Sequence, residues 1–452
     1  MEWSSGATYK NDSEQFLINE NDRKAAFTRQ YYEIYESRLN ELRPRILTNA
    51  EKIIGKGNFQ YQQLSNVVEE EEVLIIGVVV KRLSARPSIL KSLLSEDKVA
   101  YDDFEDENDD EEIKRYAASS EDRLELETDK QTIRLTGALT MNDCATGCCV
   151  GLFGKLAKGA FDVKTVIWPE TTIHNRANAS KCESLIAVIS GLELCGDICE
   201  DKKTLASFEL FADWLKGDVA DPSDSAKKVD RLVILGPSIA SKTNGCDVQS
   251  IVRTLTLSRQ EKQFSATAMT MLDKLISSLS DDIQVDLVSG VGDPCSSMWP
   301  QPPIHRVCLP RCGMTKKAVN LVTNPYQFEI NNVKFLSTSG ENVSDLLKTS
   351  PDWIGGDVLE NIVKWQHVAP NCPDSLDGFP FGSRDPFVLT STPNVLICGN
   401  QSKVETRRIK VDDESDEECV AFCIPKFSKT FGVGFIDLND LSLTFKVFDH
   451  GY

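Results

Sequence analysis

Four apolar runs in the second half of the chain end in short turns that contain glycine, proline, asparagine and acidic residues. In chain order, these turn residues are Gly191, Glu193, Gly236, Pro237, Val291, Gly292, Asp293 and Asn400. If the runs are parallel strands of one sheet, their carboxyl ends meet at the edge where ligands usually bind. Only Glu193 and Asp293 carry a carboxylate that could act as an acid, a base or a metal ligand. We favour two solvated loop carboxylates over an acid–base pair.

No other catalytic motif stands out. The chain has no G-x-S-x-G nucleophile motif and no G-x-x-x-x-G-K-[ST] phosphate-binding motif. The pair Gly55–Lys56 lacks a preceding strand and a following hydroxyl. A Cys–His nucleophile pair stays open, because nothing in the sequence marks one or excludes one.

The elements that must position the strand-end turns alternate between strands and helices. From Cys182 onward, apolar strand-like runs alternate with the helical segments Leu205–Leu215 and Ser265–Leu279. Parallel-type strands joined by helices, followed by antiparallel strands, predict a layered α/β sandwich. We assign this domain to residues 177–452.

The preceding part of the chain predicts a separate five-stranded barrel. One buried strand begins at Val73, and four short strand-like runs with glycine at their turns lie between Arg123 and His174. Five strands in a small barrel are the number expected of an OB-fold, assigned to residues 61–176. OB-folds that bind nucleic acid carry stacking aromatics and basic grooves. This segment is poor in both, so we predict a structural barrel.

The N-terminal part predicts a tail and a helical segment. Residues 1–21 are polar and are predicted to be disordered, and residues 22–60 are predicted to be helical. Because proline cannot donate a helix hydrogen bond, we expect a kink or an end near Arg43, just before Pro44. The apolar face of the helix either packs on its own domain, which we favour, or docks on a partner. A dense acidic run predicts a disordered insertion near residues 101–120, because like charges resist packing.

Composition narrows the functional classes. The 452-residue chain has a net charge of -19, which argues against free-standing, non-specific DNA binding. The polar N-terminus and the lack of a bilayer-length apolar run predict an intracellular protein with no membrane contact. The 14 cysteines are expected to be reduced structural thiols rather than disulfides or metal ligands.

The second domain resembles the calcineurin-like phosphoesterases, whose strand-end loops hold two metal ions. The resemblance implies D-x-H in the first turn, Gly-Asp in the second, G-N-H-[DE] in the third and G-H-x-H in the last. At these positions the chain carries Gly191, Glu193, Pro237, Val291, Gly292 and Asn400. Only Asp293 keeps its carboxylate, and a metal pair without its bridging aspartate and histidines binds too weakly to work. We therefore predict an inactive centre with no catalytic residue, metal or cofactor.

An OB-fold joined to an inactive phosphoesterase domain resembles the B subunits of replicative DNA polymerases. The phrases FTRQYYEIYESRLNELRP, TNPY, TSGENVSD, HVAPNCPDSL and CGNQ occur in the order found in the small subunit of the delta enzyme. The resemblance extends from Ala26 to the C-terminus and is densest from Leu321 to Gln401.

This resemblance implies a non-catalytic, nuclear accessory subunit that acts as a scaffold in DNA replication and repair synthesis. It would hold the C-terminal domain of the catalytic subunit and a third subunit. The third subunit would tether the sliding clamp, so the clamp is contacted only indirectly, and DNA only weakly or through the complex. Three alternatives stay open: a B subunit of polymerase alpha or epsilon, an active metal-dependent phosphodiesterase, and a single-strand DNA binder acting through the OB-fold.

Overall fold

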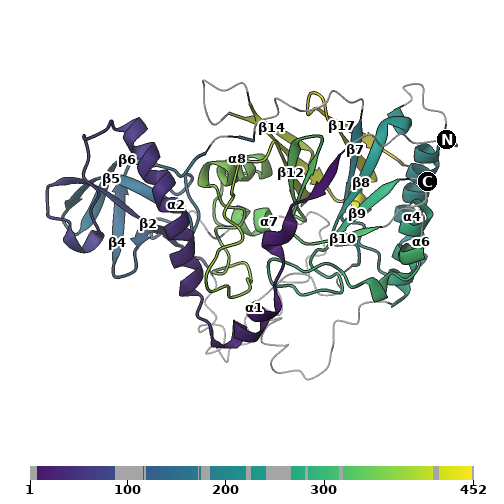
Figure 1. The fold of residues 1–452 in the computed structure, drawn as a ribbon, viewed down its shortest axis with the longest axis horizontal. Coiled ribbons are helices and arrows are strands. Elements are labelled where there is room, and N and C mark those ends of the chain that lie inside the picture. Colours follow the sequence, from purple (N-terminus) through teal and green to yellow (C-terminus); the bar gives the residue numbers. More distant parts are fainter. Residues whose placement is uncertain are drawn as a thin grey trace.

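A computed structural model describes residues 8–86, 116, 119–171, 173–174, 184–219, 225–240, 266–279, 283–314, 319–410 and 417–449. A barrel and a larger unit with two sheets lie at opposite ends of the molecule (Figure 1). The long helix α2, Tyr32–Ile53, lies against the barrel. The acidic run at 101–112 and the predicted domain boundary at 176–177 lie outside the described residues.

The barrel has the five strands that the sequence predicts. They are β2 (Glu72–Arg82), β3 (Arg123–Glu127), β4 (Thr132–Gly137), β5 (Cys149–Ala157) and β6 (Ala160–Ile167). They are hydrogen-bonded in the order β2-β3-β4-β6-β5 and close into a barrel, which confirms the prediction. Strand β2 is apolar on both faces because Ile75 and Val79 fill the barrel while Leu74 and Ile76 contact α2.

Helix α2 packs its apolar face on the barrel, as the sequence analysis favoured. Leu42 and Ile46 are fully buried there. The helix continues to Ile53, so the end predicted near Arg43 is wrong. Pro44 lies on the exposed face, where its ring does not disturb the packed side. Burial of the opposite face therefore outweighs the lost hydrogen bond.

The larger unit contains two six-stranded sheets. The first sheet has the order β1 (Tyr9–Asn11), β11 (Tyr326–Ile330), β12 (Val333–Thr338), β13 (Val395–Gln401), β15 (Cys419–Pro425) and β14 (Glu405–Ile409). The second has the order β10 (Asn320–Val322), β9 (Gln284–Val288), β8 (Val229–Leu235), β7 (Leu185–Ser190), β16 (Gly432–Asp437) and β17 (Leu443–Val447). Apolar side chains from both sheets form one core between them, including Val188, Val233, Phe335 and Ile397.

Helices cover the outer face of each sheet (Figure 1). Helices α7 (Glu341–Leu347) and α8 (Gly355–Trp365) pack on the first sheet, and α4 (Lys202–Lys216) and α6 (Ala266–Leu279) on the second. The shorter elements are η3 (Leu64–Asn66), η4 (Ser225–Lys228), η5 (Arg306–Cys308), η6 (Cys312–Met314) and α9 (Phe427–Thr430). The arrangement confirms the predicted layered α/β sandwich.

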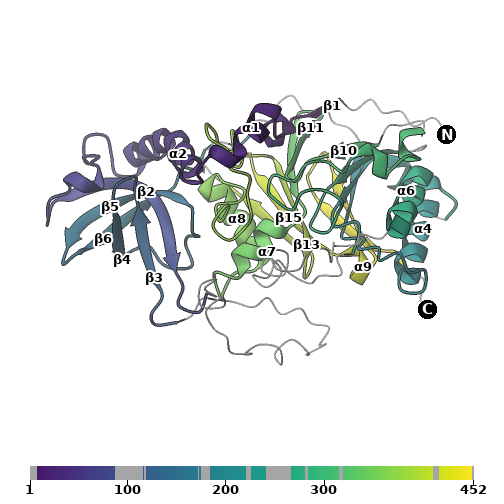
Figure 2. The ribbon, with the colours of Figure 1, turned by 90° about the horizontal axis from the view of Figure 1, so that it is seen from below.

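The N-terminal segment runs along the larger unit, as Figure 2 shows. Strand β1 adds to the edge of the first sheet by pairing with β11. In η1 (Ser13–Phe16), the Ser13 hydroxyl bonds to Gln327 and Phe16 is 1% exposed. The predicted disorder of residues 1–21 is therefore wrong for residues 8–21, and residues 1–7 lie outside the described part.

The disorder prediction failed because β1 is ordered by pairing with a strand that is distant in the sequence, and local composition does not reveal such a partner. The chain then forms α1 (Glu20–Ala25) and η2 (Ala26–Thr28) before α2 begins. The helical stretch predicted for residues 22–60 is thus interrupted ahead of Tyr32 rather than at the proline.

Candidate functional site

Parallel strands from both sheets bring their carboxyl ends to one edge of the sandwich. In one sheet β7, β8 and β9 are mutually parallel neighbours, and in the other β12 and β13 are parallel. Asn400, at the end of β13, bonds to residues at the ends of β7, β8 and β12. The sequence therefore predicted correctly that these turns come together.

The Asn400 side chain occupies the centre of this edge. Its Nδ2 donates to the carbonyl oxygens of Gly236 and Ser339, each at 2.6 Å, and its backbone N–H donates to the Ser190 hydroxyl at 2.8 Å. Gly191 has a φ of +62°, and a Cβ there would lie 2.3 Å from Asn400 Oδ1. The turn after β7 thus requires glycine to make room for the amide. An N–H donor between two carbonyls holds the loops together and repels a cation.

Glu193 turns away from this centre. Its carboxylate forms an ion pair with Lys426 at 3.0 Å and accepts a hydrogen bond from the Ser428 hydroxyl at 2.6 Å. Its backbone N–H donates to the Pro237 carbonyl at 3.2 Å. The carboxylate is engaged, and its side chain is 24% exposed. Glu193 is thus a partly exposed carboxylate held by Lys426 and Ser428.

Asp293 is 5% exposed, and its carboxylate accepts hydrogen bonds from the backbone of neighbouring loops. One carboxylate oxygen accepts N–H groups from Ser238 and Ile239 at 2.8 and 3.0 Å, and the other accepts from Gly290 at 2.9 Å. Burial raises the pKa of Asp293 to about 7, although the three amide donors act in the opposite direction. Asp293 is thus neither solvated nor paired with Glu193, because the two carboxylates bind different groups.

The remaining predicted positions, Val291 and Gly292, lie in the same loop as Asp293. The Val291 N–H donates to the carboxylate of Glu341 at 2.9 Å. Burial raises the pKa of Glu341, and its other oxygen accepts from Asn324 at 3.0 Å. Glu341 is a carboxylate at this edge that the strand-end motifs did not indicate.

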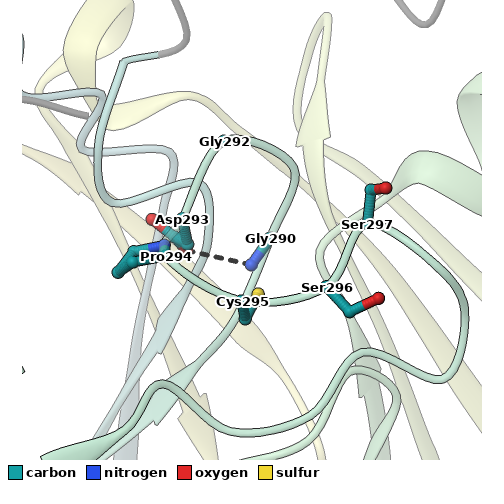
Figure 3. Close-up of a pocket in the computed structure, with 7 residues that line it drawn as sticks. All are labelled: Gly290, Gly292, Asp293, Pro294, Cys295, Ser296 and Ser297. Carbon is teal, nitrogen blue, oxygen red and sulfur yellow. Dashed lines mark hydrogen bonds between the residues drawn. The ribbon is translucent and has the colours of Figure 1, made fainter. Parts of the chain in front are cut away.

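A pocket of about 360 Å³ opens beside this loop (Figure 3). Its lining residues are Gly290, Gly292, Asp293, Pro294, Cys295, Ser296 and Ser297. Asp293 is the one carboxylate among them, and its bond to the Gly290 N–H is drawn in Figure 3. Burial raises the pKa of Cys295 to about 12, so this thiol is protonated at neutral pH. The pocket therefore offers neither a free carboxylate nor a thiolate.

The three histidines that the structure describes, His174, His305 and His367, do not complete a metal site. His367 is buried in a different network, His305 is exposed at the start of η5, and His450 lies outside the described residues. Among the residues that the structure describes, no three His, Cys, Asp or Glu side chains are placed to hold a metal ion. The 12 described cysteines are free thiols. No helix in the described ranges is long and apolar enough to cross a membrane.

A second polar network, which the sequence analysis missed, joins the barrel to the larger unit. Arg38 of α2 is fully buried and donates to the Asp385 carboxylate at 2.7 Å. It also donates to three backbone carbonyls, those of Gly147, Pro370 and Cys372, at 2.8 to 2.9 Å. One guanidinium therefore links α2, a barrel loop and two loops of the larger unit. We refer to Arg38 and these partners as the interdomain joint.

His367 completes the joint. Its Nδ1 accepts the Ala369 N–H at 3.2 Å, so its Nε2 carries the proton and donates to Asp385 at 2.9 Å. Burial and the nearby Arg38 lower the pKa of His367 to about 4, which keeps it neutral. Burial alone would raise the pKa of Asp385, but Arg38 and His367 hold it well below its usual range.

A sequence signal for the joint existed. Arg38 lies between Ile34 and Leu42 at spacings of four, on the buried face of the helix. A charged residue on such a stripe needs a buried partner. The partner is 347 residues away, so the sequence alone could not identify it.

Other contacts make the same boundary rigid. Lys81 of the barrel donates to the Thr349 carbonyl and the Ser350 hydroxyl, and its ammonium lies 4.6 Å from the centre of the Trp353 ring. The indole N–H groups of Trp353 and Trp365 donate to barrel-side carbonyls at 3.0 and 3.2 Å. Both units also share one apolar core. The barrel and the sheets therefore behave as one packed body.

Comparison with known proteins identifies relatives of this chain. Residues 30–166 match the model of the DNA polymerase delta subunit OB-fold domain, and residues 186–406 match that of the DNA polymerase alpha/epsilon B-subunit family. A Caenorhabditis elegans protein named "Probable DNA polymerase delta small subunit" is 54% identical over 100% of this chain and 99% of the relative. The chain belongs to the family of DNA polymerase delta small subunits.

More distant family members cover nearly the same span. The Drosophila melanogaster DNA polymerase delta subunit 2 is 28% identical over 96% of this chain and 95% of its own length. The Saccharomyces cerevisiae DNA polymerase delta small subunit is 27% identical over 93% of this chain and 89% of its own. The delta OB-fold model includes α2 and all five barrel strands, which confirms the OB-fold prediction.

Proposed function

We propose that this chain is the non-catalytic small subunit of a nuclear DNA polymerase delta. In this role it holds the C-terminal domain of the catalytic subunit and a third, clamp-tethering subunit during replication and repair synthesis. The observation that carries the proposal is the 54% identity to a delta small subunit along the whole chain. The net charge of -19 is consistent with protein partners and with only weak, complex-dependent contact to DNA.

The strand-end edge is, in this proposal, a degenerate phosphoesterase centre. The Asn400 amide donates its N–H groups to two carbonyl oxygens, so these oxygens are not free to bind a cation. Pro237 has no carboxylate to bridge two metals. Asp293 is the one acidic residue kept from the expected ligands, and both its oxygens already accept backbone N–H groups. These contacts support a structural role for the former ligand positions Gly191, Glu193, Pro237, Val291, Gly292 and Asn400.

The interdomain joint supports the scaffold mechanism. A scaffold raises the effective concentration of two modules for each other only if its geometry allows both to bind at once. Arg38 binds four acceptors in three separate segments, and the two units share one apolar core. In this proposal, such a body presents its two binding surfaces at a constant separation.

Co-purification tests the proposal. The chain is co-expressed with the C-terminal domain of its own organism's delta catalytic subunit and, separately, with the matching alpha and epsilon domains. A stoichiometric complex with delta alone supports the assignment. A complex with alpha or epsilon instead, or with none of them, would contradict it.

A second assay addresses the phosphodiesterase alternative. Pure protein is incubated with Mn²⁺ and a phosphodiester substrate, beside an Asp293→Asn variant. We expect no turnover from either protein, since the described residues offer no metal cluster. Manganese-dependent hydrolysis that disappears in the variant would show an active centre and overturn the non-catalytic assignment.

A further inference from the structure

A short segment between β9 and β10 displays large apolar side chains in an unusual way. In residues 305–314, Val307 is 77% exposed and Met314 is 81% exposed. No large apolar residue elsewhere in the described part of the chain is as exposed as these two. A single exposed apolar residue is ordinary, but two within ten residues set this segment apart from the rest of the described surface.

The segment is folded and anchored. Asp273 of α6 is 3% exposed, and its carboxylate accepts the N–H groups of Arg311 and Cys312 at 3.0 Å each. Leu309 and Cys312 are buried in the core that α4 and α6 share with the second sheet. Val307 lies in the turn η5 and Met314 in the turn η6, on either side of these anchors. The exposed side chains are therefore presented by an ordered backbone, which lowers the entropy cost of binding.

The charge of the segment is opposite to that of the chain. Arg306 and Arg311 are exposed, and within the described ranges neither forms an ion pair. The whole chain carries -19. Two unpaired cations beside two exposed apolar side chains complement a surface of the reverse charge that also offers apolar groups.

We propose that residues 305–314 are a docking surface for an acidic segment of a partner subunit that also carries apolar side chains. Carboxylates of the partner contact Arg306 and Arg311, and its apolar side chains cover Val307 and Met314. The inference rests on the proposed function as a polymerase subunit. Nucleic acid fits less well, because it requires many cations and stacking aromatics. The segment offers two arginines and no Phe, Tyr or Trp.

Charge reversal tests the surface. The full-length variant Arg306→Glu with Arg311→Glu is titrated against the recombinant C-terminal domain of the catalytic subunit and, separately, the third subunit of the same organism. We expect the Kd for one of them to rise at least about tenfold. The ratio of variant to wild-type Kd should be larger at low salt, where charges are screened less. The matched control reverses two exposed lysines, Lys52 in the last turn of α2 and Lys56 just after it. We expect Lys52→Glu with Lys56→Glu to leave both Kd values unchanged.

The experiment distinguishes a failure of the docking surface from a failure of the subunit assignment. If the wild-type chain binds a partner and charge reversal changes neither Kd, the docking surface is overturned while the subunit assignment stands. If the wild-type chain binds neither probe, the proposed function fails and the inference fails with it. The variant Val307→Ser with Met314→Ser guards against misfolding, because both side chains are exposed. It should weaken binding without lowering the melting temperature.

Cross-linking identifies the occupant. A photo-reactive amino acid replaces Val307 or Met314 in the reconstituted complex with primer–template DNA, and the linked peptide is sequenced. We expect a partner-subunit peptide with net negative charge and apolar side chains. A cross-link to DNA, a link to a basic or neutral peptide, or no link at all would overturn the proposal.

Discussion

Replacing Arg38 with methionine tests whether the interdomain joint stabilises the molecule. Arg38 and Asp385 are both 0% exposed, so the substitution leaves a buried carboxylate without its main counter-charge. Removing one partner of a buried ion pair costs about 3–5 kcal/mol. Three backbone carbonyls lose a donor as well, which places the expected loss toward the upper end of that range. Folded chains are stable by only about 5–15 kcal/mol, so the effect should be large.

The assay is urea unfolding of the pure chain, followed by tryptophan fluorescence. Trp168, Trp353 and Trp365 lie together at the boundary between the two units, with Trp365 centred 5.7 Å from Trp353 and 6.5 Å from Trp168. Because three of the six tryptophans lie at this boundary, part of the fluorescence signal reports on it. We expect the urea midpoint of Arg38→Met to fall well below that of the wild-type chain.

The matched control is Arg45→Met on the same helix. Arg45 is 23% exposed, lies 3.6 Å from Glu41, and donates to the Leu389 carbonyl at 2.7 Å. Its loss should cost about 1 kcal/mol or less. Adding Asp385→Leu to Arg38→Met removes the unpaired charge and should recover about 1–3 kcal/mol. If Arg38→Met and Arg45→Met unfold at the same urea concentration, the reasoning about the joint is refuted.

Four further outcomes are expected. Asn400→Asp places a carboxylate against two carbonyls and should lower the free energy of unfolding in urea by about 2–4 kcal/mol. An unchanged urea midpoint would contradict the role of the Asn400 amide in holding the strand-end loops together. Gly147→Ala sets a Cβ 1.8 Å from a backbone carbonyl and should abolish soluble expression, whereas Gly159→Ala, with nothing within 4 Å, should cost about 1–2 kcal/mol. The folded pKa of Asp293, about 7, exceeds its ordinary value of 3.8, so the folded state binds the extra proton and stability falls as pH rises from about 4 to 7. In a series of urea midpoints measured at different pH, Asp293→Asn should remove this fall in stability. The pKa of His367 is lowered to about 4, so its contribution to stability rises between about pH 4 and 6.5. His367→Gln should remove that rise.

Local sequence patterns were sufficient to predict the elements that depend on neighbouring residues. Alternating apolar residues and glycine turns indicated the barrel strands, and the spacing of Phe208 and Phe211 indicated the helix that the structure has as α4. The apolar runs before Gly191, Gly236 and Asn400 likewise indicated the strands that meet at one edge. Their period and length are set by a few residues, so sequence reasoning was sufficient.

Long-range contacts escaped the same reasoning. Strand β1 is polar, and its order comes from pairing with β11 more than three hundred residues away. Pro44 predicted an interruption, but it faces solvent while the opposite face of α2 is buried. At the strand-end edge, the sequence singled out Glu193 and Asn400 but not the groups that they bind. The hydrogen bonds of the Asn400 amide and the ion pair of Glu193 with Lys426 join segments that are far apart in the chain.

The joint also shows what a buried charge adds to an apolar core. An apolar core tolerates small rotations of one unit against another, because dispersion contacts depend weakly on direction. A guanidinium donates in a planar fork, and Arg38 satisfies it with four acceptors from α2's partner loops. Only one relative orientation of barrel and sheets keeps all four bonds. Losing any of them in the buried interior is costly. The ion pair with Asp385 therefore selects an orientation that the shared apolar core alone would leave less sharply defined.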